Sequence, residues 1–520
     1  MHGSELTMAR GQGSGAFFHR ARESRTFAIR FGLAALIITQ LSLFVHPVGF
    51  MGGPSDDQRY LDIALAWWRN GPSAGSTHWA LRVPLIAAID FAFHAAGPGL
   101  PALLAVPRFF YALFVLTSSI AMARWTGRRT ACIWLALIIV SPVLHKMATS
   151  CFPEIVELAM GTVSMTAYIA ARHARATPAR LGLLALSGVA LGIGVVTRET
   201  IGFLALGYVW AAIFNPAMPR RDYLLLGAAL ALPVVADVGW LWWLTGDPLY
   251  RLHVGENHLH IFSAHLRGGV YTGGGPFLNP DLASRWIPSG PTRLYWPINP
   301  IGDFLIDPDF GFVALACALI ALPFLRRGRR LKLPPYAVPL LIAVALGCYL
   351  TVTWIFTLRP QPRYYLPVIA AAQVGLALAL AAMMARHDLR RRAIALFALV
   401  LIGGVVPILA TRPAGMLEDR AIAYIGRHPG TYAAREDNFA SRLVYRAQVA
   451  RLAVPIHGDP PVGGYRLSGI SSKDVRLAGG RFPTQVGYRQ VALVHLDRTI
   501  IERIFKPDGW RALRVERRDF

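Results

Sequence analysis

Two adjacent carboxylates begin the first polar loop of the chain. Asp56 and Asp57 follow a long apolar run, Ile29–Phe44, and a turn at Gly53 and Pro54. A helix dipole stabilises negative charge at the helix N-terminus, so the pair fits the first turn of a short amphipathic helix. One acid is enough for an N-cap. Two neighbouring acids can hold different pKa values, so one of them can accept a proton. We predict a catalytic base here, or a cation site.

A further acid, Glu154, follows Pro153 at the start of a later apolar run. This order of residues is common where a helix begins. Glu157 lies one helical turn deeper, and ionisable residues inside membrane helices usually face a cavity or a partner. We therefore predict that Glu154 and Glu157 line one polar pocket.

Arginines occur at two boundaries between apolar runs. Arg198 and Glu199 form a charged pair that can neutralise itself, but a guanidinium at this depth can also bind a phosphate through two parallel hydrogen bonds. Arg359, Arg363 and Tyr364 precede a late apolar run. Tyrosines are common at the membrane surface, so the arginines are the more informative part. We predict a phosphate-binding role for these residues.

A long polar loop follows Tyr250 and carries the best candidate metal ligands in the sequence. His258 and His260 are separated by one residue, and Glu256 could complete a set of nitrogen and oxygen ligands. A polar loop that covers a cavity explains the same residues, and we favour that interpretation. A divalent metal at these histidines, or at the paired aspartates, is the less favoured alternative, so we predict no metal cofactor.

The composition indicates a membrane protein. Of 520 residues, 54% are hydrophobic and 16% are charged, and the mean hydropathy is +0.42. Soluble multidomain proteins are less apolar. The formal net charge of +24 comes mostly from short basic clusters between apolar runs. Positive charge in such loops sets the orientation of a membrane protein, so we predict a lipid bilayer as partner and no nucleic acid.

The apolar runs predict about eleven membrane-spanning helices. The basic clusters fall on alternate loops, on the side of the N-terminal tail, which the positive-inside rule places in the cytoplasm. Leu81–Ala96 carries charged residues along its length and is predicted to lie at the membrane surface. The predicted spans are Ile29–His46, Pro101–Ala123, Ala131–Leu144, Ile155–Ala171, Leu181–Val196, Ile201–Phe214, Leu224–Leu244, Gly311–Leu325, Tyr336–Phe356, Leu366–Ala385 and Ala393–Ala410.

The last hundred or so residues differ from the rest. No run of spanning length follows residue 411, Gln490–Leu496 alternates as a strand does, and Phe439–Ala453 has a helical pattern. The predicted fold is an all-α polytopic membrane protein with a small C-terminal soluble α/β domain. The predicted divisions are a cytoplasmic tail at 1–28, a transmembrane catalytic domain at 29–411 and a periplasmic domain at 412–520.

The order of these motifs resembles that of membrane glycosyltransferases of the GT-C fold. The similarity covers about residues 29–411 and is greatest to bacterial relatives of protein mannosyltransferases and aminoarabinose transferases. It implies inverting transfer of a sugar from a polyprenyl-phosphate donor to a lipid, glycan or protein acceptor, on the outer face of the bacterial inner membrane. The Lys-Pro-Pro-Leu stretch of the aminoarabinose transferases is absent, and Leu81–Leu85 stands in its place. The sugar and the acceptor are therefore left open.

The resemblance also implies roles for individual residues. Asp56 matches the catalytic base, and Glu154 matches the later acid of the same cavity. Asp57 matches the second acid of the pair, which supports the first or contacts a cation. Arg198 matches a basic residue near the donor phosphate, and Arg363 with Tyr364 matches a pair at the lipid-phosphate entrance.

Two other functions use similar sequences. A flippase for lipid-linked oligosaccharides, or another transporter, would carry ionisable groups near mid-membrane and related halves. The charges here crowd the outer boundary, and no internal repeat is evident. A polysaccharide polymerase or ligase relies on a large late loop, so the long loop Thr245–Asp309 keeps that alternative open.

Overall fold

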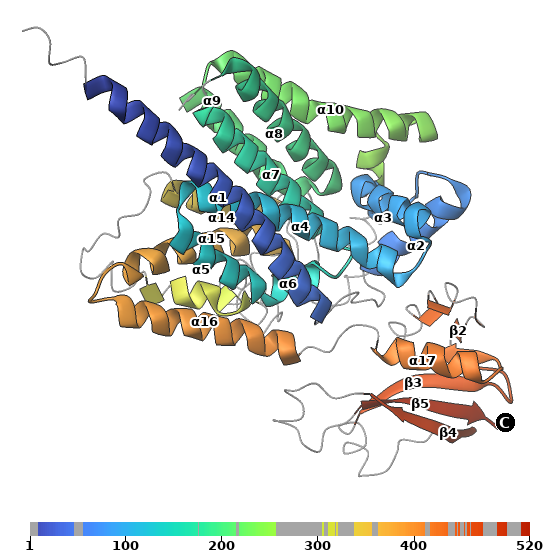
Figure 1. The fold of residues 1–520 in the computed structure, drawn as a ribbon. Coiled ribbons are helices and arrows are strands. Elements are labelled where there is room, and N and C mark those ends of the chain that lie inside the picture. The colour runs from blue at the N-terminus through green and yellow to red at the C-terminus, as the bar shows by residue number, and fades with distance from the viewer. Residues whose placement is uncertain are drawn as a thin grey trace, which may run out of the picture.

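The computed structural model describes most of residues 9–434 and parts of 443–519. Its polypeptide forms a bundle of helices followed by a small sheet, as Figure 1 shows. The predicted class, an all-α membrane protein with a small C-terminal α/β part, is confirmed. The longest stretches outside the description are 1–8, 46–55, 256–303, 321–336, 435–442, 472–485 and 497–510.

Six segments of the described chain are helical, long and apolar enough to cross a bilayer. Each coincides with one of the eleven predicted spans. The segment nearest the N-terminus is the second half of a longer helix, because only its last 20 residues are apolar. The helices concerned are α1 (Ala9–Val45), α4 (Leu100–Trp125), α8 (Thr177–Thr197), α10 (Arg220–Thr245), α15 (Leu366–Met384) and α16 (Arg390–Ala410).

The other predicted spans differ from a single long apolar helix. The expected span Ala131–Leu144 is divided, because Pro142 cannot continue the helix before it. The predicted span Gly311–Leu325 is described only as far as residue 320. The helices of this group are α5 (Arg128–Ile139), α6 (Pro142–Met147), α7 (Pro153–His173), α9 (Phe203–Phe214), and α14 (Ala337–Leu350) with the π-helical turn η4 (Thr351–Ile355).

Three short helices lie between α1 and α4: α2 (Asp56–Asn70), the 3-10 turn η1 (His78–Leu81) and α3 (Val83–Ala96). The 14 residues of α3 extend about 21 Å, at about 1.5 Å per residue. The hydrocarbon core of a bilayer is about 30 Å thick. The length of α3 therefore agrees with a helix that does not cross.

Helix α8 packs between α7 and α10 (Figure 1). Gly188 and Gly192 make the contact with α10 possible. A Cβ atom on Gly188 would lie 2.4 Å from the carbonyl oxygen of Leu226, and one on Gly192 would lie 2.4 Å from that of Leu230. Small residues spaced four apart let two membrane helices approach closely.

We expect Gly192→Ala to lower the free energy of unfolding by about 1–3 kcal/mol, since the added methyl group forces α8 and α10 apart. Thermal unfolding of the purified protein in detergent measures the effect. Gly182→Ala is the matched control on the same helix, because a Cβ there meets nothing within 4 Å. Equal melting temperatures for the two variants would contradict this packing.

The C-terminal part contains helix α17 (Met416–Arg427) and a five-stranded mixed sheet with the order β2-β1-β3-β5-β4. The strand predicted at Gln490–Leu496 is confirmed as β4. The helix predicted at Phe439–Ala453 lies mostly outside the described residues, and the domain boundaries remain predictions. The strands are β1 (Tyr432–Ala434), β2 (Ile456–His457), β3 (Tyr465–Ser471), β4 (Tyr488–His495) and β5 (Arg511–Arg518).

Candidate functional site

Helix α2 begins at Asp56 and points this carboxylate at two partners from other elements. The indole nitrogen of Trp79 donates a 2.9 Å hydrogen bond to one carboxylate oxygen, and Nη2 of Arg363 lies 2.7 Å from the other. Burial alone favours the neutral acid, but the charge of Arg363 and the Trp79 hydrogen bond outweigh it. The pKa of Asp56 therefore lies below its ordinary value. Neighbouring Asp57 is fully buried, and its Oδ1 accepts a 3.1 Å hydrogen bond from the backbone nitrogen of Gln58.

Helix α7 supplies two more carboxylates from its first turns, and both are buried. Oε1 of Glu154 lies 2.6 Å from Nη1 of Arg198 and 3.6 Å from Nε of Arg363. Glu157 lies 3.8 Å from Arg198, and the hydroxyl of Thr200 donates a 2.5 Å hydrogen bond to it. The two acids that were predicted to share a pocket thus lie beside the same arginine, Arg198.

The two arginines are held by aromatic rings as well as by acids. Arg198 stands in extended conformation between α8 and the 3-10 turn η2 (Glu199–Gly202), and its guanidinium lies 4.5 Å from the ring centre of Tyr364. The guanidinium of Arg363, in the 3-10 turn η5 (Pro362–Tyr365), lies 4.4 Å from the ring of Phe152 and 5.0 Å from that of Tyr364. Cation–π contacts of this kind orient a guanidinium without neutralising it.

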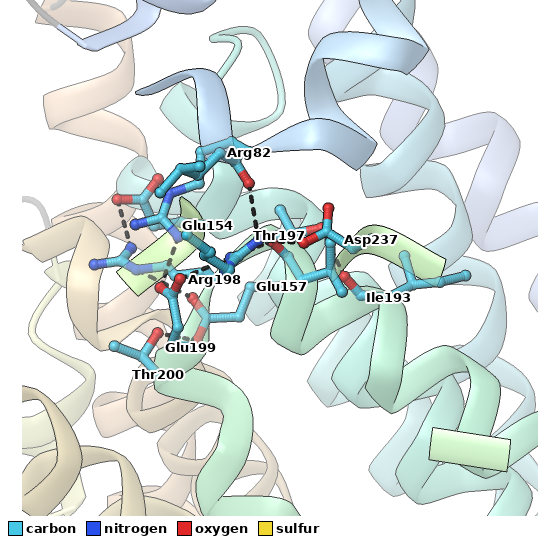
Figure 2. Close-up of polar contacts among 12 residues, drawn as sticks. Arg82, Glu154, Glu157, Ile193, Thr197, Arg198, Glu199, Thr200 and Asp237 are labelled. Carbon is cyan, nitrogen blue, oxygen red and sulfur yellow. Dashed lines mark hydrogen bonds and ion pairs between the residues drawn. The ribbon is translucent and has the colours of Figure 1, made fainter. Parts of the chain in front are cut away.

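The structure therefore brings together six of the residues singled out in the sequence, from four separate elements. Figure 2 shows Glu154, Glu157 and Arg198 in contact where α7 begins and α8 ends. Their roles in chemistry remain predictions. We call this group the acid–arginine cluster: Asp56, Glu154, Glu157, Arg198, Arg363 and Tyr364.

The remaining predicted residues are placed differently. The hydroxyl of Tyr250 donates a 3.0 Å hydrogen bond to the carbonyl of Gly75, between α2 and η1. The other four, which are Arg359, Glu256, His258 and His260, lie outside the described residues. In the part of the chain that the structure describes, no group of three or more His, Cys, Asp or Glu side chains could hold a metal ion.

A second charged group lies beside the acid–arginine cluster, and the sequence did not reveal it. Glu199 is clamped between Arg82 at 2.6 Å and Arg251 at 2.7 Å. Arg251 also lies 2.9 Å from Asp237 and donates to the backbone carbonyl of Val196. Asp237 was detectable, because an acid inside an apolar run needs a buried partner. Figure 2 shows Arg82, Glu199 and Asp237 near Arg198.

An apolar cavity of about 170 Å³ lies among the membrane helices next to the cluster. Ile201, which follows the Arg198 turn, and Pro367, which follows η5, both line it. The cavity extends past Gly161 and Leu378 to Trp125 at the far end of α4. Its wall is almost entirely apolar, so it can hold a hydrocarbon chain.

The lowered pKa of Asp56 predicts how stability depends on pH. A carboxylate with a depressed pKa in the folded protein stabilises it above the unfolded-state pKa, about 3.9, and this contribution is lost as the pH falls through the folded-state value. We expect the difference in melting temperature between wild type and Asp56→Asn to be constant between about pH 5 and pH 8 and to shrink in stronger acid. A difference that changes near neutral pH would contradict the Asp56–Arg363 ion pair.

Comparison with known proteins gives the fold. No protein-family model and no curated protein sequence matches the chain. Among solved structures, the chain is similar to ArnT from Cupriavidus metallidurans in the apo state, with a TM-score of 0.51 and 13% identity. It is equally similar to the same protein bound to undecaprenyl phosphate, with a TM-score of 0.52 and 13% identity. Both alignments cover 94% of this chain and 98% of the other.

A weaker similarity links the chain to the archaeal oligosaccharyltransferase AglB from Archaeoglobus fulgidus. The TM-score is 0.41 at 14% identity, over 82% of this chain and 64% of the other. The agreement with ArnT over 94% of this chain and 98% of the other shows that the chain has the GT-C fold.

Proposed function

We propose that this protein is a glycosyltransferase that moves a sugar from a polyprenyl-phosphate donor to a hydroxyl of a lipid, glycan or protein acceptor. The acid–arginine cluster is the observation that carries the proposal. It sets a partly exposed carboxylate, Asp56, beside Arg363, and Glu154 joins Arg363 to Arg198. Both guanidinium groups can bind phosphate. The GT-C fold supports the same class of reaction.

The proposed chemistry is a single displacement. Asp56 accepts the proton of the acceptor hydroxyl, while the hydroxyl oxygen forms a bond to the anomeric carbon of the sugar. The bond from that carbon to the donor phosphate breaks, and its electron pair leaves with the polyprenyl-phosphate anion. Arg198 and Arg363 stabilise the charge on the departing phosphate. Because attack and departure occur on opposite faces of the sugar, the product is inverted.

The apolar cavity supports a donor that is linked to a lipid. A polyprenyl chain must lie in apolar surroundings while its phosphate reaches the arginines. The cavity begins at Ile201 and Pro367, directly beyond the segments that carry Arg198 and Arg363. We propose that the first prenyl units lie there.

The proposed location is the bacterial inner membrane, with the N-terminus in the cytoplasm and the C-terminal domain in the periplasm. The distribution of basic clusters in the loops supports this orientation. It places the acid–arginine cluster at the outer leaflet, where lipid-linked sugars replace nucleotide sugars as donors.

We expect transfer to continue when the protein is treated with EDTA, because Asp56 and the arginines supply the base and the positive charge that the reaction needs. The measurement compares initial rates before and after chelation. Activity that is lost on chelation and restored by one divalent cation would support a metal at Asp56 and Asp57, or at His258 and His260.

The proposal is tested by supplying the purified protein with a panel of polyprenyl-phosphate sugars and candidate acceptors. Release of polyprenyl phosphate together with a glycosylated product would support it. Binding of every donor without turnover would contradict it and would favour transport of the lipid-linked sugar.

A further inference from the structure

In the acid–arginine cluster, each arginine is already paired with a carboxylate. The three carboxylates of the cluster, Asp56, Glu154 and Glu157, face the two guanidinium groups of Arg198 and Arg363. A donor phosphate adds further negative charge. Like charges at these distances repel strongly in a buried site. A phosphate can therefore bind one of these arginines only if a carboxylate leaves its ion pair with that arginine.

Arg363 can change partners without moving far. Its guanidinium is held over the ring of Phe152 at 4.4 Å and over that of Tyr364 at 5.0 Å. The hydroxyl of Tyr364 accepts a 3.2 Å hydrogen bond from Nη2. These contacts do not involve the carboxylates, so they remain when an ion pair opens.

Of the three carboxylates, Asp56 can most easily leave its arginine. Its side chain is 32% exposed, whereas that of Glu154 is 3% exposed. Asp56 also keeps its hydrogen bond from Trp79 when Arg363 leaves. Other titratable groups near Asp56 are His78 from η1, and Asp57 and Tyr60 from α2 itself.

We propose that the donor phosphate displaces Asp56 from Arg363, so that the base becomes available to the acceptor only when a donor is bound. In the resting protein, the guanidinium holds the carboxylate in its charged form and makes it a weak base. When the phosphate takes this guanidinium, the affinity of Asp56 for a proton rises at the moment when the acceptor must be deprotonated. The inference rests on the proposed function, because it assumes a phosphate-bearing donor.

Chemical labelling of the full-length protein tests the exchange. A water-soluble carbodiimide with an amine nucleophile modifies carboxyl groups in their protonated form, and peptide mass spectrometry measures the modified fraction of Asp56. The probe is undecaprenyl phosphate in mildly acidic buffer that contains EDTA, which removes any effect of divalent cations. We expect labelling of Asp56 to rise about threefold or more when the lipid is bound. Labelling that is unchanged or reduced with the lipid bound would overturn the proposal.

Two controls isolate the role of Arg363. Asp62 lies on the same helix, where its carboxylate accepts a 2.7 Å hydrogen bond from Gln58, and its labelling should not respond to the lipid. In Arg363→Gln, Asp56 should be labelled strongly with or without the lipid, and Arg363→Met, which also removes the positive charge, serves if the first variant does not fold. Weak labelling of Asp56 in both variants would also overturn the exchange.

A separate measurement of lipid binding distinguishes failure of the proposed function from failure of the proposed exchange. If undecaprenyl phosphate does not bind the wild-type protein by native mass spectrometry, the proposed function is wrong and the exchange fails with it. If the lipid binds and Asp56 labelling does not rise, the exchange is wrong while the proposed function stands.

Discussion

Asp56→Asn is expected to lower the rate of sugar transfer by about 10²–10⁴-fold, the range that general base catalysis supplies. Asparagine has nearly the same shape and keeps an oxygen for the hydrogen bond from Trp79, but it cannot take a proton from the acceptor. Binding of undecaprenyl phosphate should persist, because Arg198 and Arg363 remain. Initial rates and lipid binding, measured on the same preparation, check both halves of this prediction.

Asp62→Asn is the matched control for this variant, because it makes the same change six residues later on α2 at an exposed position. Its transfer rate should equal that of wild type. A rate for Asp56→Asn within a few-fold of wild type would show that another carboxylate, such as Glu154, accepts the proton.

Arg198→Met is expected to lower the free energy of unfolding by about 3–5 kcal/mol, because it removes the countercharge beside buried Glu157 and leaves Glu154 with only the more distant Arg363. The methionine fills part of the space and contacts Tyr364, so the main loss is electrostatic. Adding Glu154→Gln should restore part of the stability without restoring transfer. Thermal unfolding and initial rates measure the two effects.

Arg221→Met provides the comparison on the surface. The side chain of Arg221 is 84% exposed and lies 4.0 Å from Asp222, so its removal should cost no more than about 1 kcal/mol. If Arg198→Met melts at the wild-type temperature, the ion pairs of Arg198 contribute little to the folded state. The interpretation of the acid–arginine cluster as a tightly paired site would then be wrong.

The sequence predicted the acid–arginine cluster better than it predicted the clamp around Glu199. Glu154 and Arg198 stand where an apolar run begins or ends, and Asp56 follows a Gly/Pro turn at the start of an amphipathic helix, so each could be recognised from its immediate neighbours. The contact between Arg82 and Glu199 joins residues 117 positions apart and depends on how α3 packs against α8. No local pattern encodes that packing, and the charges of both residues have ordinary local explanations.

The helices show the same division between local and distant information. Hydropathy located the six long apolar segments, because each has the length that a bilayer requires. The run Ala131–Leu144 looks equally apolar, yet it is divided at Pro142. Proline at that place predicts a helix boundary on local grounds alone. The mean hydropathy of the run is high enough to suggest one span, and it therefore hid the helix boundary that Pro142 predicts.

A structure of the protein with undecaprenyl phosphate tests the central claim most directly. The account predicts that phosphate oxygens lie within hydrogen-bond distance of Arg198 or Arg363, that the prenyl chain enters the cavity at Ile201 and Pro367, and that Asp56 no longer contacts Arg363. A phosphate bound away from these arginines, or at the opposite end of the membrane helices, would contradict it.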